Sequence, residues 1–351
     1  MQFTPRNAPF LVGPNTVSAL MRRVSLALVP GILAMFWYFG IGVLINLILA
    51  ACAAMAFEAL MLRLRGRPIA PAQGSGLNDG SALLTGLLLG LCLPPLAPWW
   101  IPVLGAFTAL VLAKHLYGGL GFNPFNPAMI GYVVLLVSFP REMTQWLPVN
   151  DLLGQAPSLG DSLSWVFTGA QGLDAYTQAT PLDHLKTELG LSRTVEEIIS
   201  DPKFGGIGGT GWEWINLAYL LGGAYLIKSG DIDWRIPGGM LSGIAIMATL
   251  FVALDGDAYR GPAFHLFSGA AMLGAFFIAT DPVSASTTPK GRIYYGLGIG
   301  VLVYLIRTWG GYPDGVAFAV LLMNIAAPTI DYYTQPRTFG EGDDLKGPGH
   351  D

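Results

Sequence analysis

Long apolar runs alternate with short polar segments along this chain. Most of the runs are about 15–20 residues long, which is enough for a helix to cross a bilayer core of about 30 Å. This pattern predicts an all-α membrane protein with about ten transmembrane helices. The predicted spans cover residues 24–39, 41–61, 80–96, 101–117, 127–139, 213–228, 237–254, 264–280, 293–307 and 316–331.

Basic residues between the apolar runs orient the predicted helices. Arg22 and Arg23 precede the first span, and Arg63, Arg65 and Arg67 follow the second. In the ten-span arrangement, 13 of the 19 Lys and Arg residues lie on the side of the N terminus. Because the cytoplasmic loops of membrane proteins carry an excess of Lys and Arg, this distribution predicts that both termini are cytoplasmic.

A long polar loop, residues 140–212, follows the fifth predicted span and is therefore expected on the outer side. It contains nine acidic residues against four basic ones. A structureless loop of this length would be unusual, so we expect it to carry helices or a function. Two helix starts are predicted in it: Thr180-Pro181-Leu182-Asp183, with Gly190 ending the helix, and the capping box Thr194-Val195-Glu196-Glu197.

The two halves of the chain resemble each other. Ser81–Pro95 can be laid over Ser268–Pro282 at a constant offset, and each segment ends a helix at a proline. Because five spans per half is an odd number, the halves would have opposite orientations, which is an architecture of transporters. The predicted organisation is a first membrane half (1–139), an outer loop (140–212), a second membrane half (213–331) and a cytoplasmic tail (332–351).

The composition fits a membrane protein and excludes several functions for this chain. Hydrophobic residues make up 52% and charged residues 12%, about half the charged fraction of soluble domains. The net charge of −4 argues against a nucleic acid partner. Cys52 and Cys92 lack the spacing of a zinc or iron–sulfur site, and no glycine-rich dinucleotide fingerprint is present. We therefore expect no metal site here, and expect NADH oxidation to belong to partner proteins.

One polar stretch of the outer loop, "DAYTQAT" (174–180), carries candidate chemistry. It resembles the Asp-x-x-(Ser/Thr)-x-Ala-Thr motif, whose last threonine receives FMN in phosphoester linkage from a flavin transferase. Asp174, Thr177 and Ala179 match the motif, Thr180 is the acceptor, and Gln178 replaces the more usual Gly. The alternative is that Thr180 is an ordinary helix N-cap. Both can hold, because a helix N-terminus favours a phosphate.

Three further segments extend the resemblance over nearly the whole chain. Together with the flavin motif, the chain resembles the NqrB/RnfD family, membrane subunits of the ion-translocating Rnf complex and of the sodium-pumping NADH:quinone oxidoreductase. The segments are "SGLNDGSALLTGLLLGLCLPP" (75–95), "GGLGFNPFNPAMIGY" (118–132) and "FFIATDPVSASTTPKG" (276–291).

The resemblance implies a specific fold and function. The fold would be two inverted five-helix repeats, related to urea-transporter-like proteins, in the bacterial inner membrane. FMN would be covalently attached to Thr180 on the periplasmic side, with a second, non-covalent riboflavin inside the membrane. The partners would be a flavin transferase and the other Rnf subunits (A, B, C, E and G). The complex would couple electron transfer between NADH and ferredoxin to Na⁺ or H⁺ translocation.

Two asparagines in "GFNPFNPAMIG" have two interpretations. Asn123 and Asn126 can cap a helix that begins at Pro127, or their amides can bind the ring edge of the implied riboflavin. Asn126-Pro127-Ala128 is also the tripeptide of aquaporins, whose pores need two such motifs in facing half-helices. The second half of this chain has none, so we reject a water channel.

Ionisable residues are rare inside the predicted spans. Asp281, which precedes Pro282, could bind a coupling ion or form a helix-end turn. Glu58 is expected to pair with one of the nearby cytoplasmic arginines. Because ion pathways usually display such residues, the sequence predicts no complete path through this subunit.

Three functions therefore remain to be compared. The first is a redox subunit that relays electrons through covalent FMN, the second a urea- or ammonium-type channel of the same fold, and the third a purely structural membrane anchor. Fold alone does not decide between them. The motif at 174–180 favours the redox subunit, because a channel or an anchor has no need of it.

Overall fold

The computed structural model describes residues 16–69, 76–153, 157–169, 176–312 and 314–336. These residues form helices, turns and loops, with one isolated bridge between Phe204 and Gly209 and no strand among them. The prediction of an all-α protein is confirmed. Each of the ten ranges that the sequence predicts as spans overlaps a helix.

The helices follow one another in three groups. The first contains α1 (Val17–Ala27), α2 (Val29–Phe39), α3 (Ile41–Leu64), α4 (Ser81–Cys92), α5 (Trp100–Phe107), the π-helix η2 (Thr108–His115) and α6 (Pro127–Ser138). The second contains α7 (Pro140–Thr144), α8 (Asn150–Leu153), α9 (Leu159–Thr168), α10 (Pro181–Gly190) and α11 (Val195–Ile198). The third contains α12 (Trp212–Ser229), α13 (Arg235–Leu254), α14 (Pro262–Leu266), α15 (Ala271–Leu273), the π-helix η4 (Gly274–Ile278), α16 (Pro289–Trp309) and α17 (Val316–Thr334).

Four helical stretches in the described part of the chain are long and apolar enough to cross a membrane. They are Val17–Phe39, where α2 follows α1 directly after Leu28, and the helices α3, α13 and α17. Shorter apolar helices, among them α4 and α6, lie beside them. These features establish a helical membrane protein.

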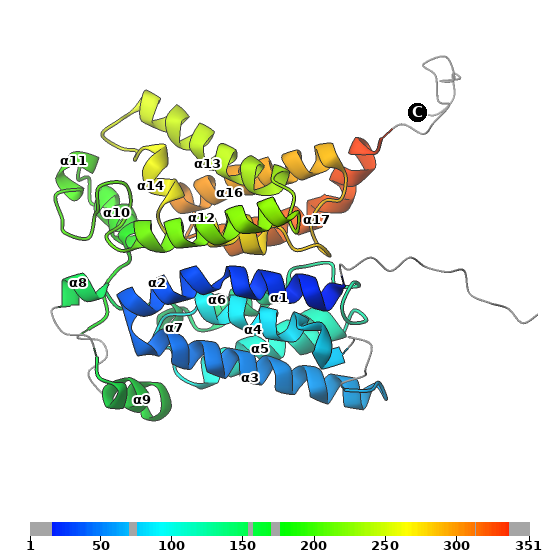
Figure 1. Cartoon of the computed structure of the whole chain (residues 1–351). Coiled ribbons are helices and arrows are strands. Elements are labelled where there is room, and N and C mark those ends of the chain that lie inside the picture. The colour runs from blue at the N-terminus through cyan, green and yellow to red at the C-terminus, as the bar shows by residue number, and fades with distance from the viewer. Residues whose placement is uncertain (1–15, 70–75, 154–156, 170–175, 313, 337–351) are drawn as a thin grey trace, which may run out of the picture.

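The first and third groups of helices form two halves that pack against each other (Figure 1). Helix α12 contacts α1 and α2 across the boundary, and α17 contacts α6. Inside the first half, α3 packs on α4 and α5; inside the second, α13 packs on α16. These pairs of helices form a large part of the boundary between the halves.

Glycines allow a close helix crossing between α13 and α16. A Cβ atom on Gly243 would lie 2.7 Å from the carbonyl oxygen of Leu297, and one on Gly239 would lie 2.8 Å from that of Ile293. A larger residue at either position would force the backbones apart. Small residues at helix crossings are typical of membrane proteins, in which close packing drives association.

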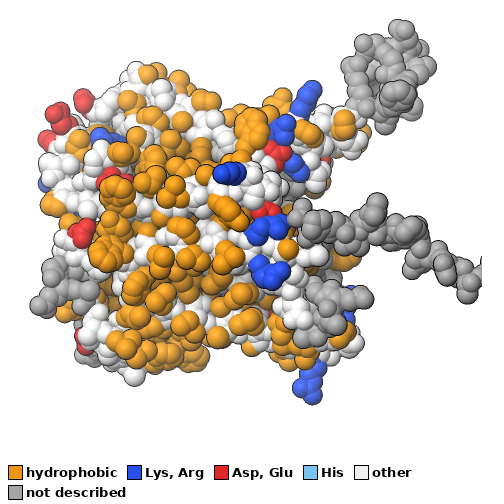
Figure 2. Space-filling model, in the orientation of Figure 1, with side chains coloured by type: hydrophobic (Ala, Val, Ile, Leu, Met, Phe, Trp, Pro, Cys, Tyr) orange, Lys and Arg blue, Asp and Glu red, His pale blue; other side chains and the backbone are white. Residues whose placement is uncertain are grey.

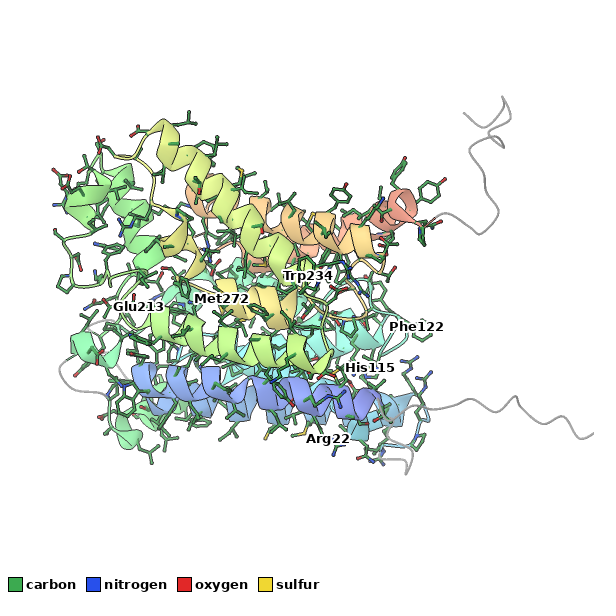
Figure 3. The ribbon with its side chains drawn as sticks, turned by 45° about the horizontal axis from the view of Figure 1, so that its top comes forward. Arg22, His115, Phe122, Glu213, Trp234 and Met272 are labelled. Carbon is green, nitrogen blue, oxygen red and sulfur yellow. The ribbon has the colours of Figure 1, made fainter. Side chains whose placement is uncertain are left out.

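The two ends of the molecule differ in composition. The start of α1 and the end of α17 lie at one end, and helices α8 to α11 gather at the other (Figure 1). Figure 2 shows hydrophobic side chains across the middle, Lys and Arg mainly near the first end and Asp and Glu at the second. Arg22, His115 and Phe122 likewise lie at the end opposite Glu213 (Figure 3). We call the end that holds α8 to α11 the loop end.

Candidate functional site

Thr180 lies at the N-cap of α10, as the sequence predicts. Its backbone is extended, with φ −63° and ψ 159°, and its Oγ1 accepts a hydrogen bond from the backbone N–H of Asp183 at 3.3 Å. Pro181 occupies the first helical position, where its missing N–H costs nothing. The helix ends at Gly190, also as predicted. The capping interpretation of Thr180 is therefore confirmed.

Helix α10 is anchored to the second membrane half. Leu182 and Leu185 are buried and form a small apolar cluster with Ile198 and Phe264. Lys186 extends its Nζ into the C-terminal end of α16, where the carbonyl oxygens of Ile306, Gly310 and Tyr312 accept from it. The negative end of the α16 dipole also favours a cation at this position.

The surroundings of Lys186 change the pKa of its amine. Burial lowers the pKa of the Lys186 amine below its ordinary value of 10.5, although the charge of Asp183 acts in the opposite direction. Asp183 is the third residue of the same helix and lies close to Thr180. The first turn of α10 therefore holds a carboxylate whose charge is partly balanced by Lys186.

The rest of the predicted flavin motif approaches α10 in an irregular segment. The backbone N–H of Gln178 donates to the carbonyl oxygen of Trp146 at 2.9 Å. The ring of Tyr176 packs against that of Trp165, with centroids 5.3 Å apart. Thr177 and Ala179 are half-buried. Asp174, the first motif residue, lies outside the described residues.

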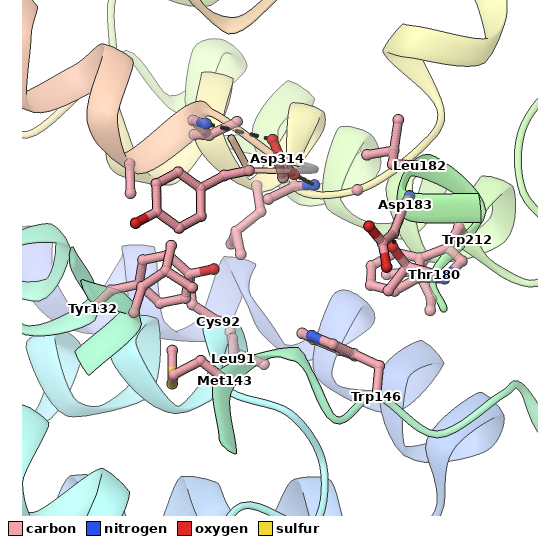
Figure 4. Close-up of a pocket in the computed structure, with 18 of the residues that line it drawn as sticks. Leu91, Cys92, Tyr132, Met143, Trp146, Thr180, Leu182, Asp183, Trp212 and Asp314 are labelled. Carbon is pink, nitrogen blue, oxygen red and sulfur yellow. Dashed lines mark hydrogen bonds between the residues drawn. The ribbon is translucent and has the colours of Figure 1, made fainter. Parts of the chain in front are cut away.

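A cavity of about 110 Å³ opens beside Thr180, between the two membrane halves (Figure 4). Thr180, Pro181, Leu182 and Asp183 contribute to its wall from the start of α10. Most of the remaining wall is apolar or aromatic. It includes Met35, Leu91, Cys92, Met129, Tyr132, Leu136, Met143, Trp146, Trp212, Ile215, Tyr219, Leu273, Ile278 and Tyr312. A largely apolar wall with a few polar groups is typical of cofactor sites.

Aromatic rings at the cavity form a connected cluster. Trp146 and Trp212 lie 5.4 Å apart between ring centroids. Both pack against Phe39, at 5.8 Å and 5.3 Å, with T-shaped geometry. These rings come from α2, from the loop after α7 and from α12, so the cluster joins all three groups of helices. Such rings can stack on a planar ligand.

Asp314 is the acidic group on the opposite wall of this cavity (Figure 4). Its Oδ2 accepts from the backbone N–H of Ala270 at 2.8 Å, and its Oδ1 accepts from Nε and Nη2 of Arg307, both at 3.2 Å. Arg307 is buried and also donates to the carbonyl oxygens of His265 and Ser268. The carboxylate is therefore paired, and it fixes the break between α14 and α15.

A second cavity, of about 90 Å³, lies between the halves and is lined by both predicted asparagines. Asn126 is the N-cap of α6, and its Oδ1 accepts from the N–H of Met129 at 3.2 Å. Its Nδ2 donates to the carbonyl oxygen of Ile278 at 3.2 Å, and its own backbone N–H donates to Oδ1 of Asn324 at 3.1 Å. The cap predicted for Asn126 is confirmed, whereas the cap predicted for Asn123 is not found, and Asn126 also joins the two halves.

Asn123 differs from Asn126 in its bonding. Its side chain is buried, and its Nδ2 donates to the carbonyl oxygen of Phe125 at 3.0 Å. Its Oδ1 is buried and has no hydrogen-bond partner among the described residues. A buried acceptor without a donor is costly, so a ligand with an N–H or O–H group would satisfy it.

Comparison with known proteins places the chain in a family. Residues 4–340 match the NQR2, RnfD, RnfE family. The chain belongs to this family. It is 54% identical over 349 residues to the D subunit of the ion-translocating oxidoreductase complex of Aeromonas hydrophila, covering 96% of this chain and 99% of the relative.

Other members of the NQR2, RnfD, RnfE family are similarly close. The protein of the same name from Pseudomonas aeruginosa is 56% identical over 335 residues, covering 95% of this chain and 94% of the relative. That of Escherichia fergusonii is 51% identical over 352 residues, covering 97% and 99%. The resemblance inferred from the sequence motifs is therefore confirmed.

Glu58 forms a buried charge cluster in this family member. Its Oε2 lies 2.8 Å from Nζ of Lys114 and 2.9 Å from Nε2 of His115. Lys114 also donates to Oγ of Ser81 at 2.8 Å. The expectation that Glu58 pairs with an arginine is wrong. Arg65 lies instead on the other side of the His115 ring, 3.3 Å from Nδ1.

Glu58 pairs with a residue that is distant in the sequence. Glu58 on α3 and Lys114 on η2 are far apart in the sequence, and only the packing of the two helices brings them together. The arginines that follow α3 are closer to Glu58 in the sequence, but they remain nearer the surface. A lysine near the end of an apolar run was the only signal.

Asp281 forms a turn at the end of the segment that contains η4. Its Oδ1 accepts from the N–H of Val283 at 3.3 Å and its Oδ2 from Oγ of Ser284 at 2.7 Å. The helix-end turn predicted from the sequence is confirmed. Within the described ranges, no group of three His, Cys, Asp or Glu side chains has the geometry to hold a metal ion.

Proposed function

We propose that this chain is a redox subunit of an ion-translocating oxidoreductase complex, and that it relays electrons through FMN covalently bound to Thr180. The relatives that carry this name match the chain over nearly their whole length. The observation that carries the flavin proposal is the position of Thr180. It ends a segment that resembles a flavin-attachment motif, it caps α10, and it borders an aromatic cavity.

The surroundings of Thr180 fit a phosphoester. Its Oγ1 accepts one hydrogen bond, from the Asp183 N–H, and this atom has no second hydrogen-bond partner among the described residues. A phosphate at this oxygen would lie at a helix N-terminus, whose N–H groups and dipole favour an anion. Lys186 offsets part of the negative charge that the Asp183 carboxylate adds to this turn.

The cavity beside Thr180 fits the ring system of the flavin. The indole rings of Trp146 and Trp212 and the phenol of Tyr132 line it, and its few polar groups are Thr144, Asp183, Asp314 and the Thr180 hydroxyl. The bound flavin supplies one-electron chemistry, and the protein holds it, excludes water and tunes its potential. The apolar wall of the cavity would hold the flavin and exclude water.

We also propose a second, non-covalent riboflavin in the cavity lined by Asn123 and Asn126. The unpaired Oδ1 of Asn123 can accept a hydrogen bond from a ring N–H. The side chain of Asn126 is already hydrogen-bonded to Met129 and Ile278, so we propose that it contributes less than Asn123 to binding the riboflavin. NADH, ferredoxin and the Na⁺ or H⁺ coupling belong to the whole complex, in which the A, B, C, E and G proteins are the partners.

The proposed architecture is two inverted repeats of five spans, with 1–139 and 213–331 as the membrane halves. The pairing of helices across the boundary supports it. The first span (α1 and α2) contacts the sixth (α12), and the fifth (α6) contacts the tenth (α17). The second and fourth spans pack together in one half, as the seventh and ninth do in the other. A two-fold relationship requires these matched contacts.

The proposed topology puts both termini in the cytoplasm and the loop 140–212 in the periplasm, across a bacterial inner membrane. The separation of basic and acidic side chains between the two ends supports it. A flavin transferase that works outside the cytoplasm could then reach Thr180. A urea- or ammonium-type channel of the same fold is the alternative function, and it gives no reason for the motif around Thr180.

In-gel fluorescence of the denatured chain under ultraviolet light tests this function. The wild-type chain from cells with a flavin transferase should fluoresce, and Thr180→Ala should not. Thr177→Ala should retain part of the signal, because in the motif it is a recognition residue. Thr194→Ala is the matched control, since Thr194 caps α11 in the same loop but lies outside the motif. A dark wild-type band would contradict the proposal.

A further inference from the structure

Helix α9 is an element that the hydrophobic pattern of the sequence does not predict. Its N-cap is Ser158, whose Oγ accepts from the N–H of Asp161 at 3.2 Å. It ends at Gly169, which has a left-handed backbone with φ 64°. Local capping therefore defines this helix at both ends, within the loop between the two membrane halves.

The side chains of α9 form a buried row and, next to it, an exposed apolar row. Ser162 and Val166 are buried against the rest of the protein. Leu159, Leu163 and Phe167 follow each other at intervals of four residues and are 57%, 39% and 49% exposed. Because a helix repeats every 3.6 residues, these three side chains form one stripe along the helix. An exposed apolar stripe of this kind needs a covering partner.

The side of α9 away from the stripe carries polar residues beside the half-buried Trp165. Asp161, Ser164 and Thr168 are exposed there, and the helix contains no Lys or Arg. The helix is thus amphipathic, with an apolar side that is only half covered by the protein. The absence of basic residues means that attraction to anionic headgroups does not contribute to its binding.

The position of α9 identifies what covers the stripe. The helix packs against α3, one of the apolar helices long enough to cross the membrane, at the loop end (Figure 1). The carbonyl oxygen of Val166 accepts from the N–H of Trp99, and Trp99 is 45% exposed. Tryptophans are enriched at the level where the bilayer meets water. The stripe therefore lies beside a helix long enough to cross the membrane, near the exposed Trp99.

We propose that α9 lies flat on the membrane at the loop end, with Leu159, Leu163 and Phe167 inserted between the lipid headgroups. Helices of this kind bury their apolar side about 5–10 Å into the boundary between headgroups and acyl chains. The occupant of the stripe is therefore lipid and not another protein.

This placement has a consequence for the neighbouring loop. Trp165 lies on the side of α9 away from the stripe, and its ring contacts that of Tyr176, four residues before Thr180. The membrane contact would therefore set the height of this segment above the bilayer. The effect on the position of a flavin at Thr180 rests on the proposed function, whereas the contact of α9 with lipid does not.

Depth-dependent quenching tests the lipid contact directly. The full chain, in its complex and in phosphatidylcholine nanodiscs, carries Cys52→Ala and Cys92→Ala together with either Leu163→Cys or Ser164→Cys. Each new thiol is labelled with an environment-sensitive fluorophore and exposed to lipids that carry a quencher near the headgroup. Ser164→Cys is the matched control, because it lies next to Leu163 but faces water.

The expected result is several-fold stronger lipid quenching of the label at position 163 than at position 164, with the reverse order for aqueous iodide. Replacing part of the phosphatidylcholine by an anionic lipid should leave both values unchanged. Equal lipid quenching at the two positions would overturn the proposal. Protection of position 163 from both quenchers would also overturn it, because another protein would then cover the stripe.

Discussion

The backbone N–H of Asn126 donates to Oδ1 of Asn324 at 3.1 Å, across the boundary between the two membrane halves. The Nδ2 of Asn324 donates to the hydroxyl of Tyr295 at 2.7 Å and to the carbonyl oxygen of Ser284 at 3.1 Å. One buried side chain thus joins α6 to the second half. In a low-dielectric interior such a network stabilises only when all its members are paired.

Replacing Asn324 should therefore weaken the packing of the two halves. In Asn324→Ala the N–H of Asn126 loses its acceptor, and an unpaired buried donor costs about 1–3 kcal/mol. The free energy of unfolding in mixed micelles should fall by this amount. Leu322→Ala on the same helix is the control, because Leu322 is half exposed and should have a small effect. Equal losses in both variants would argue against the network.

The Glu58–Lys114 pair gives a second prediction. Both side chains are buried, and Lys114→Met would leave the Glu58 carboxylate without its lysine partner. Breaking a buried ion pair from one side costs about 3–5 kcal/mol. The double variant Glu58→Gln with Lys114→Met removes both charges and should recover most of the loss. Thermal unfolding of the three proteins measures this, and a double variant no more stable than Lys114→Met would contradict it.

A third prediction concerns the anchoring of α10. Lys186→Met removes the contacts to the carbonyl oxygens of Ile306 and Tyr312, so α10 should open more often from the membrane half. Amide hydrogen exchange in residues 181–190 should become faster, while exchange in α13 and α16 stays unchanged. Lys203→Met in the same loop is the control. Unchanged exchange in α10 would show that Lys186 does not hold it.

The Arg23–Asp231 pair predicts a dependence on pH. Burial raises the pKa of the Asp231 carboxyl, but hydrogen bonds from Arg23 and Ser229 and the charge of Arg23 lower it by more, to below 3.8. A lowered carboxyl pKa stabilises the fold above the unfolded value, and the effect is lost as the pH falls through the folded value.

Asp231→Asn tests that dependence. The variant should be less stable than the wild type at pH 7, because Arg23 loses its charged partner. Below about pH 4 the wild type should lose stability more steeply than the variant, so the two melting curves should converge. Melting temperatures in detergent between about pH 3 and pH 7 measure this. Parallel curves over the whole range would contradict the assigned pKa.

Local features could be predicted from the sequence more readily than contacts between distant segments. The caps at Thr180, Thr194 and Asn126 depend on three or four consecutive residues, and each is found where the sequence predicts it. The partner of Glu58 could not be predicted, because Lys114 approaches it only after α3 and η2 pack. The hydrophobic pattern does not predict α9, because its apolar stripe is short and interrupted by polar residues.

The same distinction applies to the candidate site. Thr180 was identified from a seven-residue motif, which is a local signal. The sequence predicted no role for Trp212 or Asp314, which reach the cavity from other helices. Such residues have ordinary neighbours in the sequence and acquire their role from the arrangement of the helices. Predicting them would require the packing of the two halves.

The central claim is that Thr180 carries FMN, and mass spectrometry of the peptide that contains it tests this claim most directly. The chain is purified from cells that contain a flavin transferase and digested, and Thr180→Ala is processed in parallel. The wild-type peptide should show the added mass of FMN less one water, with fragment ions that place it on Thr180. Asp174→Ala should show less of it. A wild-type peptide of unmodified mass would contradict the account.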